Sequence, residues 1–280
     1  MSSELLKHCE PNEYYEQYLL ESVYPDGRSL TDFRGTSIQV GFNSAVRGSS
    51  LVKQAGSMLD VSVDLDLALK GDDDDAQLTF NLGAPESMDE TLIEDANMIL
   101  DQLNENKAFV NFASVIANDD RFIWNIKVNV QVLSHDNAFI DALVTAVSAA
   151  LLNTKIPEIS YAEQIDEDAP LEVNKAVVTT KSYPIKLVDV PISCAFAIYK
   201  TITKKEPESI ILADPIPELS DFVVSKCIFV VGYGESIHSM VISGGETVEI
   251  NTIKKLHSLA KNRHQTISLA LKNITGRLHE

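Results

Sequence analysis

The stretch from Arg121 to Pro157 most constrains the fold, because its apolar residues change from a period of two to a helical period within a few positions. From residue 124 onward apolar and polar residues alternate, which predicts a half-buried strand with the apolar row Trp124, Ile126, Val128, Val130 and Val132. After the turn-forming residues 134–137 comes an alanine-rich segment whose larger apolar side chains share one helical face, namely Ile140, Leu143, Val144, Val147 and Leu151. A helix this apolar packs on several sides, so we expect it inside the protein. Asn153 is suited to its C-terminal end, and Pro157 forbids its continuation.

The rest of the chain repeats an arrangement of strands followed by a helix. Helices are expected from Pro11 to Val23, from Glu86 to Leu103 and from Glu246 to Ile274. The further strands are expected at 38–42, 51–54, 59–67, 78–82, 185–188, 194–199, 210–212, 226–231 and 237–242. This succession predicts an α/β fold of the α+β type, with two mixed sheets and helices packed against them.

The chain of 280 residues is long enough to bury a large core. We expect a single domain over residues 1–280. Its parts are an N-terminal helix and turn (1–27), an N-terminal half (28–160), an acidic connection (161–182) and a C-terminal half with the final helix (183–280).

The net charge is unusually negative, with 23 Lys and Arg against 41 Asp and Glu, or −18. A surface this acidic repels a polyanion unless basic residues gather locally. The six Lys and Arg of residues 249–280 outnumber two Glu there. They are either the source of weak, strongly salt-dependent RNA binding or, at least as readily, the solvated face of the last helix: Lys254, Lys255, Lys261, Arg263, Lys272 and Arg277. A free-standing nucleic-acid-binding protein is therefore excluded. The acidic body instead suits one component of an assembly whose other components are basic.

Neither a membrane partner nor a disulfide framework is expected. The chain has no apolar run of membrane-spanning length, and its first residues lack the blocks of a signal peptide. Its three widely spaced cysteines, Cys9, Cys194 and Cys227, form no paired motif, which favours reduced thiols in an intracellular compartment.

No cofactor or metal motif is complete. The glycine-containing segments 232–234 and 243–246 fit neither of the common phosphate-binding patterns, and turns explain them. The aspartate run 72–75 lacks the spaced ligands of a calcium loop and is expected to be a solvated loop. Asp214 and Glu218 follow a predicted strand, where carboxylates are well placed for a cleft, although an isolated pair of this kind is more often structural.

Five blocks of sequence, in order over residues 11–270, resemble the RNase PH-like subunits of the eukaryotic RNA exosome. They are Glu13-Tyr14-Tyr15 running into Pro25-Asp26-Gly27-Arg28 and Phe33-Arg34, the Trp124 strand, Asp136 before Ile140-Asp141-Ala142, the helix end at 151–157, and Asp214-Pro215 with Glu218. The resemblance implies an RNase PH-like fold and a six-membered ring around an RNA channel. It also implies as partners other RNase PH-like ring subunits, RNA-binding cap subunits and associated exoribonucleases, in the nucleus, nucleolus and cytoplasm.

The turn at Asp136 separates the catalytic from the non-catalytic branch of this family. Phosphorolytic members carry Gly-Gly-Thr-Arg or a similar run there, which lets backbone amides and an arginine grip inorganic phosphate. Here the turn reads Asp136-Asn137-Ala138-Phe139, which resembles the non-catalytic pattern Asp-Gly-Asn, although Asn137 and Ala138 depart from it. Ile216 likewise replaces the threonine that the non-catalytic branch carries after Asp-Pro.

The resemblance therefore implies a non-catalytic structural subunit, not an enzyme, with no catalytic, cofactor or metal residues. The alternative is a phosphate-dependent 3′-to-5′ exoribonuclease of the RNase PH type, in which Asp214 or Glu218 would hold magnesium. For RNA contacts the candidates are Arg28, Arg34 and Arg47, each of which could equally be an ion-paired turn residue.

The charge predicts that the chain does not form a homohexamer by itself. Six identical copies would carry a net charge of 6 × −18 = −108, so they would repel one another. Basic subunits as neighbours would lower this repulsion. Light scattering of the purified chain at physiological salt tests this. A homogeneous homohexamer would contradict it.

Overall fold

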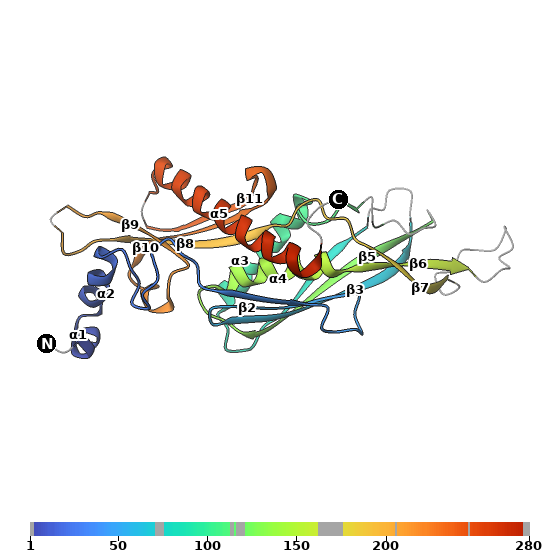
Figure 1. Ribbon diagram of the computed structural model, residues 1–280, viewed down its shortest axis with the longest axis horizontal. Helices are drawn as coiled ribbons and strands as arrows, with labels where there is room; N and C mark the ends of the chain where they lie inside the picture. The colour runs from blue at the N-terminus through green and yellow to red at the C-terminus, as the bar shows by residue number, and fades with distance from the viewer. Residues whose placement is uncertain are drawn as a thin grey trace.

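The computed structural model describes residues 3–70, 76–112, 115, 121–161, 176–204, 206–245 and 247–276. They form an elongated molecule with the N-terminal helices at one end and a two-stranded sheet at the other (Figure 1). The first large sheet has the strand order β1-β2-β3-β5-β4. Its strands are β1 (Thr36–Val40), β2 (Gly48–Gln54), β3 (Ser57–Leu69), β4 (Leu78–Gly83) and β5 (Phe122–Ser134).

The long strand predicted from the period of two is confirmed as β5, in the interior of this sheet. It pairs antiparallel with β3 and parallel with β4, so the first sheet is mixed as expected. The apolar row from Trp124 to Val132 is buried, while the polar residues between them are more exposed. Alternation was sufficient here because one face of the sheet meets the core and the other does not.

The second large sheet differs from the prediction, because it is antiparallel throughout its described pairings and not mixed. Its order is β11-β10-β8-β9, from β8 (Ile192–Lys200), β9 (Ser209–Ala213), β10 (Val223–Val231) and β11 (Ile237–Gly244). The successive pairs β8–β9 and β10–β11 are joined by short connections, which produce antiparallel neighbours, whereas a parallel pair needs a long crossover. The remaining pair, β8 with β10, is also antiparallel.

A third, two-stranded sheet was not predicted. Strand β6 (Lys155–Tyr161) pairs antiparallel with β7 (Ala176–Pro184), so residues 176–182 are strand where we expected acidic connection. Residues 162–175 of that connection, and the aspartate run 72–75, lie outside the described residues.

The strand expected at 185–188 is wrong. Only Leu187 there forms an isolated bridge, to Val110. The backbone N–H of Ile185 donates to Thr154 O and that of Val188 to Phe109 O. These partners belong to irregular segments, so no ladder forms.

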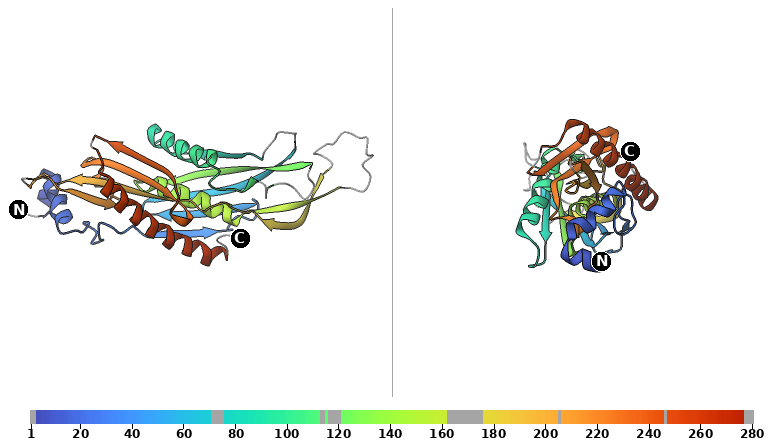
Figure 2. Two further views of the ribbon diagram at one scale, coloured as in Figure 1. Left: turned by 90° about the horizontal axis from the view of Figure 1, so that it is seen from above. Right: turned by 90° about the vertical axis from the view of Figure 1, so that its left-hand side faces the viewer.

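Five α-helices and two short 3₁₀ helices are seen in the described part of the chain. They are α1 (Ser3–Cys9), α2 (Pro11–Leu20), α3 (Glu90–Glu105), α4 (Phe139–Asn153), α5 (Ile250–Thr275), η3 (Pro217–Leu219) and η4 (Tyr233–Glu235). None of the described helices is long and apolar enough to cross a membrane. Helices α3 and α5 run along opposite sides of the molecule (Figure 2).

Helix α4 is the buried helix that the sequence predicts. All its residues from Phe139 to Leu152 are buried, because it packs on β2 and β3 of the first sheet and on β8 of the second. It therefore belongs to the cores of both halves. In its first turn, Asp141 accepts hydrogen bonds from Ser193 and Ala195 of β8, which ties the start of the helix to the second sheet.

The N-terminal segment is fastened to the second sheet by a buried carboxylate. Glu16 of α2 accepts hydrogen bonds from the backbone N–H groups of Ile202 and Thr203, from the Thr203 hydroxyl and from Tyr199 Oη. Burial alone would raise the pKa of Glu16, but these bonds outweigh it and lower the pKa. Tyr24 Oη also donates to Ala213 O, 2.8 Å away. These contacts carry the following loop across the end of β9.

The close approach of β2 to α4 predicts that Gly48→Ala destabilises the fold. A Cβ at this position would lie 2.2 Å from Thr154 Oγ1 and 2.7 Å from Ala150 O. Overpacking of this kind costs about 1–3 kcal/mol of unfolding free energy. The control is Gly35→Ala, where a Cβ meets nothing within 4 Å, and we expect a change within about 0.5 kcal/mol. Equal urea midpoints for the two variants would contradict the close packing.

Candidate functional site

Arg34 joins the two halves of the molecule at the start of α4. Its Nη1 donates to Asp136 Oδ2 at 2.9 Å. Its Nη2 and Nε donate to the two carboxylate oxygens of Asp214 at 2.6 and 2.9 Å, and its backbone N–H adds a bond of 2.8 Å to the same carboxylate. Burial tends to lower the pKa of Arg34, but the hydrogen bonds and charges of Asp214 and Asp136 outweigh it and raise the pKa. The guanidinium is thus engaged with two carboxylates at once.

Asp136 is held from three sides besides Arg34. Its carboxylate accepts from Ser57 Oγ at 2.7 Å, from the Gly56 N–H at 3.0 Å and from the Ala138 N–H at 2.9 Å. Burial raises the pKa of Asp136, but the bonds from Ser57, Gly56 and Ala138, with the Arg34 charge, lower it overall. This carboxylate therefore ties the turn between β2 and β3 to the start of α4.

Asp214 is a fully buried acid at the end of β9, with a backbone φ of 47°. Residues other than glycine rarely adopt this left-handed backbone conformation, although aspartate tolerates it better than most. The conformation is held by the bond from its N–H to Ala195 O, and by Arg28 Nη2 donating to its carbonyl oxygen at 2.9 Å. Arg28 also lies over the Tyr24 ring, 4.2 Å from its centroid.

The first amides of α4 are occupied by the preceding aspartate. The Ala138 N–H donates to the Asp136 carboxylate and the Phe139 N–H to Asp136 O. Phe139 itself is fully buried, and Asn137 Nδ2 donates to Ser220 Oγ beside η3. An anion at a helix N-terminus needs amides that point outward to it. At this turn the Ala138 and Phe139 amides are used internally.

A third aspartate and a third arginine complete the cluster, and sequence reasoning missed their roles. Asp141 accepts from Ser193 Oγ and the Ala195 N–H, and burial raises its pKa to about 6. Arg263 was expected either to contribute to weak RNA binding or to lie on the solvated face of the last helix. It instead lies over the Phe33 ring, 5.0 Å from its centroid, and donates to Thr36 Oγ1. Its place on the inner side of α5 shows in the helical stripe, because it lies three positions after the buried Ala260.

The three arginines considered for RNA contacts, Arg28, Arg34 and Arg47, lie in different environments. Arg28 and Arg34 form internal ion pairs with Asp214, which favours the structural interpretation of both. Arg47 is exposed at the start of β2, away from this cluster, and its backbone pairs with Val63 and Lys155. Glu218, the other carboxylate considered for magnesium, is exposed on η3.

The cluster contains no arrangement typical of a metal centre. Within the described ranges, no group of three His, Cys, Asp or Glu side chains is placed to hold a metal ion. Its ion pairs join Arg34 to Asp136 and Asp214, and Arg28 to Asp214 and Asp26. The geometry is therefore that of a buried ion-pair network that fixes the two halves together.

The network predicts that Arg34→Met strongly destabilises the protein. The change leaves Asp214 buried without its bidentate partner, and breaking such a pair costs about 3–5 kcal/mol. Arg34→Lys keeps the charge but loses the fork, so we expect an intermediate loss. The matched control is Arg47→Met, with a change within about 0.5 kcal/mol. Chemical denaturation of the four proteins measures the differences, and similar values for Arg34→Met and Arg47→Met would contradict the network.

Comparison with known proteins identifies the fold. Residues 32–157 match the model of the RNase PH family described as 3′ exoribonuclease family, domain 1. The exosome complex component Rrp42 of Pyrococcus abyssi is 29% identical over 191 residues, which are 63% of this chain and 66% of that protein, just under two thirds of its length.

Two solved structures extend the likeness to nearly the whole chain. A structure described as an archaeal exosome core has a TM-score of 0.68 and 21% identity, covering 97% of this chain and 98% of that one. The Archaeoglobus fulgidus exosome with RNA bound to the active site gives a TM-score of 0.70 and 21% identity, covering 93% and 97%. The chain therefore has the mixed α/β RNase PH-like fold of exosome core structures, and residues 32–157 match the first domain of that family.

Proposed function

We propose that this chain is a non-catalytic structural subunit of the RNA exosome core ring, which supports 3′-to-5′ RNA processing and degradation by associated nucleases. The observation that carries the proposal is the bridge from Arg34 to Asp136 and Asp214. It occupies the start of α4, where phosphorolytic relatives are expected to grip phosphate. The names of the related archaeal proteins support a place in the ring.

Electrostatics speak against a phosphate site at this position. Arg28 and Arg34 are balanced by Asp136 and Asp214, so these four side chains leave no net positive charge for a phosphate dianion. Opening a site would require Arg34 to leave two carboxylates, which would then lie buried without it. A buried unpaired charge costs several kcal/mol, about as much as a phosphate contact would return.

The alternative, a phosphate-dependent 3′-to-5′ exoribonuclease, has less support. It needs Asp214 or Glu218 to hold magnesium, but both carboxylate oxygens of Asp214 accept hydrogen bonds from Arg34. A cation at Asp214 would have to displace a guanidinium from a buried site. Glu218 is exposed on η3, and among the described residues no group of three His, Cys, Asp or Glu side chains is placed to hold a metal ion.

The finer identity and the cellular setting belong to the same proposal. The opening Glu13-Tyr14-Tyr15 resembles most the eukaryotic subunit called exosome component eight, of the non-catalytic branch. We place the chain among other RNase PH-like ring subunits, with RNA-binding cap subunits and associated exoribonucleases as partners, in the nucleus, nucleolus and cytoplasm. RNA would pass through the assembled channel, and Arg47 is the exposed member of the three arginines considered for contact with it.

The proposal predicts no phosphorolysis of RNA by the purified chain, even with magnesium and excess phosphate. Charge-assisted hydrogen bonds contribute roughly 1.5–3 kcal/mol each, and a site without an arginine fork and a hydroxyl donor lacks about three of them. The resulting ~5–9 kcal/mol corresponds to a factor on the order of 10³ to 10⁶ in rate or binding. Release of nucleoside diphosphates from poly(A) is the measurement.

A phosphorolytic RNase PH enzyme serves as the positive control for this assay. The scaffold proposal fails if this chain releases nucleoside diphosphates and Asp214→Asn abolishes the release while circular dichroism shows that the variant is folded. Release that persists unchanged in Asp214→Asn would indicate a contaminating enzyme.

A further inference from the structure

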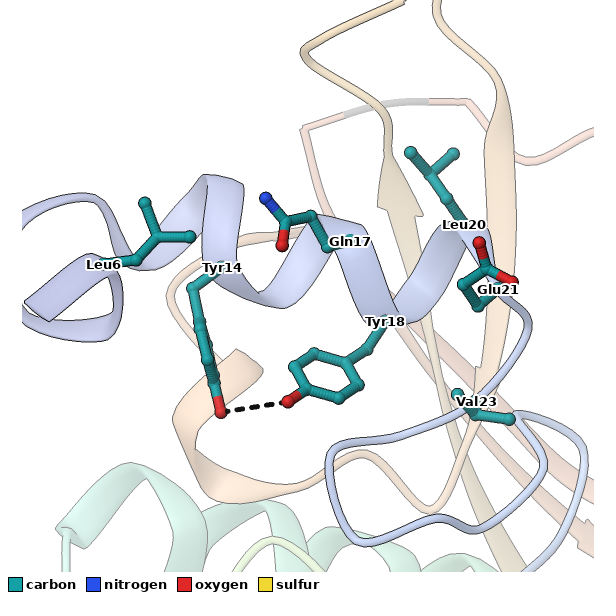
Figure 3. Close-up of a pocket in the computed structure, with 7 residues that line it drawn as sticks. All are labelled: Leu6, Tyr14, Gln17, Tyr18, Leu20, Glu21 and Val23. Carbon is teal, nitrogen blue, oxygen red and sulfur yellow. Dashed lines mark hydrogen bonds between the residues drawn. The ribbon is translucent and has the colours of Figure 1, made fainter. Parts of the chain in front are cut away.

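Helices α1 and α2 lie at the end of the molecule opposite the β6–β7 sheet (Figure 1). Residues from both helices, with Glu21 and Val23 just after α2, line a groove. Its volume is about 770 Å³. Figure 3 shows its lining, which consists of Leu6, Tyr14, Gln17, Tyr18, Leu20, Glu21 and Val23. The ion-pair network at α4 contributes none of these residues, so the groove is a separate feature.

The groove combines apolar side chains with aromatic rings. Tyr14 and Tyr18 lie edge to face with their ring centroids 5.3 Å apart, and their hydroxyl groups are 3.4 Å from each other (Figure 3). Leu20 is 41% exposed despite its size. Exposed apolar residues that gather beside tyrosines are typical of protein interfaces, where tyrosine supplies a rigid contact with a polar tip.

The ring of Tyr14 and the neighbouring ring of Tyr15 already lie beside a cation of the chain itself. Lys7 Nζ lies 5.9 Å from the centroids of both Tyr14 and Tyr15. The faces of aromatic rings carry negative potential, which favours an ammonium or guanidinium group. Glu21 adds a carboxylate to the same lining. A second cation entering the groove would find both kinds of contact.

The negative charge around the groove favours a positively charged ligand. Three exposed acids lie within residues 9–27, Glu10, Glu13 and Glu21, against the nearby cation Lys7, whereas Glu16 is buried and Asp26 pairs with Arg28. Repulsion from Glu10 is the main cause of the raised pKa of exposed Glu13, as expected for neighbouring acids. A polyanion such as RNA is repelled from this end, and so is a second copy of this chain, whose net charge is −18.

We propose that the groove between α1 and α2 docks a segment of another protein that carries Lys or Arg beside large apolar side chains. The apolar side chains of that segment would pack on Leu6, Leu20 and Val23. Its cation would lie between the tyrosine rings and Glu21. This inference goes beyond the role of ring subunit, since it names a binding surface and its chemistry whether or not the chain phosphorolyses RNA.

Fluorescence anisotropy of a labelled short peptide of alternating leucine and arginine tests the proposal with the full chain. We expect saturable binding, weakened about tenfold or more by Glu21→Lys or by Leu20→Ser, because truncating an interface anchor typically costs more than 1 kcal/mol. The matched controls are Glu86→Lys and Leu133→Ser, which change exposed side chains elsewhere and should leave the affinity unchanged. Circular dichroism checks that all four variants are folded.

Comparison peptides separate the two parts of the recognition. Replacing each arginine by glutamate, or each leucine by serine, should abolish binding. Absence of binding by the leucine–arginine peptide at about millimolar concentration would overturn the proposal, as would equal binding of the glutamate peptide or equal losses in the control variants. An oligoribonucleotide that displaces the peptide would also overturn it and would identify the groove as an RNA surface.

Discussion

One arginine, Arg34, connects the two halves of this protein. It lies in the loop before β1, and its guanidinium donates hydrogen bonds both to Asp136 at the start of α4 and to Asp214 at the end of β9. The aspartates belong to different halves of the chain, so the ion pairs fix α4 relative to both sheets. A buried network of this kind is costly to break, because each charge depends on its partner for compensation.

The same network occupies the start of α4, where the proposed absence of phosphorolysis would have its origin. A phosphate site at the start of α4 needs free amides and an unpaired cation. Here the Ala138 N–H donates to the Asp136 carboxylate and the Phe139 N–H donates to the Asp136 carbonyl oxygen. The Arg34 guanidinium forms ion pairs with both Asp136 and Asp214. These amides and this guanidinium therefore make contacts within the protein, which is consistent with the structural role proposed above.

The sequence predicted what depends on local periodicity and missed what depends on distance along the chain. Strand β5 and helix α4 follow from spacing alone, because alternation and a helical stripe report which side faces the core. The bridge between Arg34 and Asp214 joins residues 180 apart, and no local pattern encodes it. The strand expected at 185–188 failed for a related reason, since apolar residues there pack without a neighbouring strand to pair with.

A double-mutant cycle on Arg34 and Asp214 tests the bridge most directly. Unfolding free energies are measured for the native protein, Arg34→Met, Asp214→Asn and the double variant. If the two side chains stabilise the fold mainly by their interaction, the double variant loses little more unfolding free energy than either single variant. The coupling free energy is then about 2 kcal/mol or more. Losses that add to within about 0.5 kcal/mol would contradict the bridge as the constraint that holds the halves together.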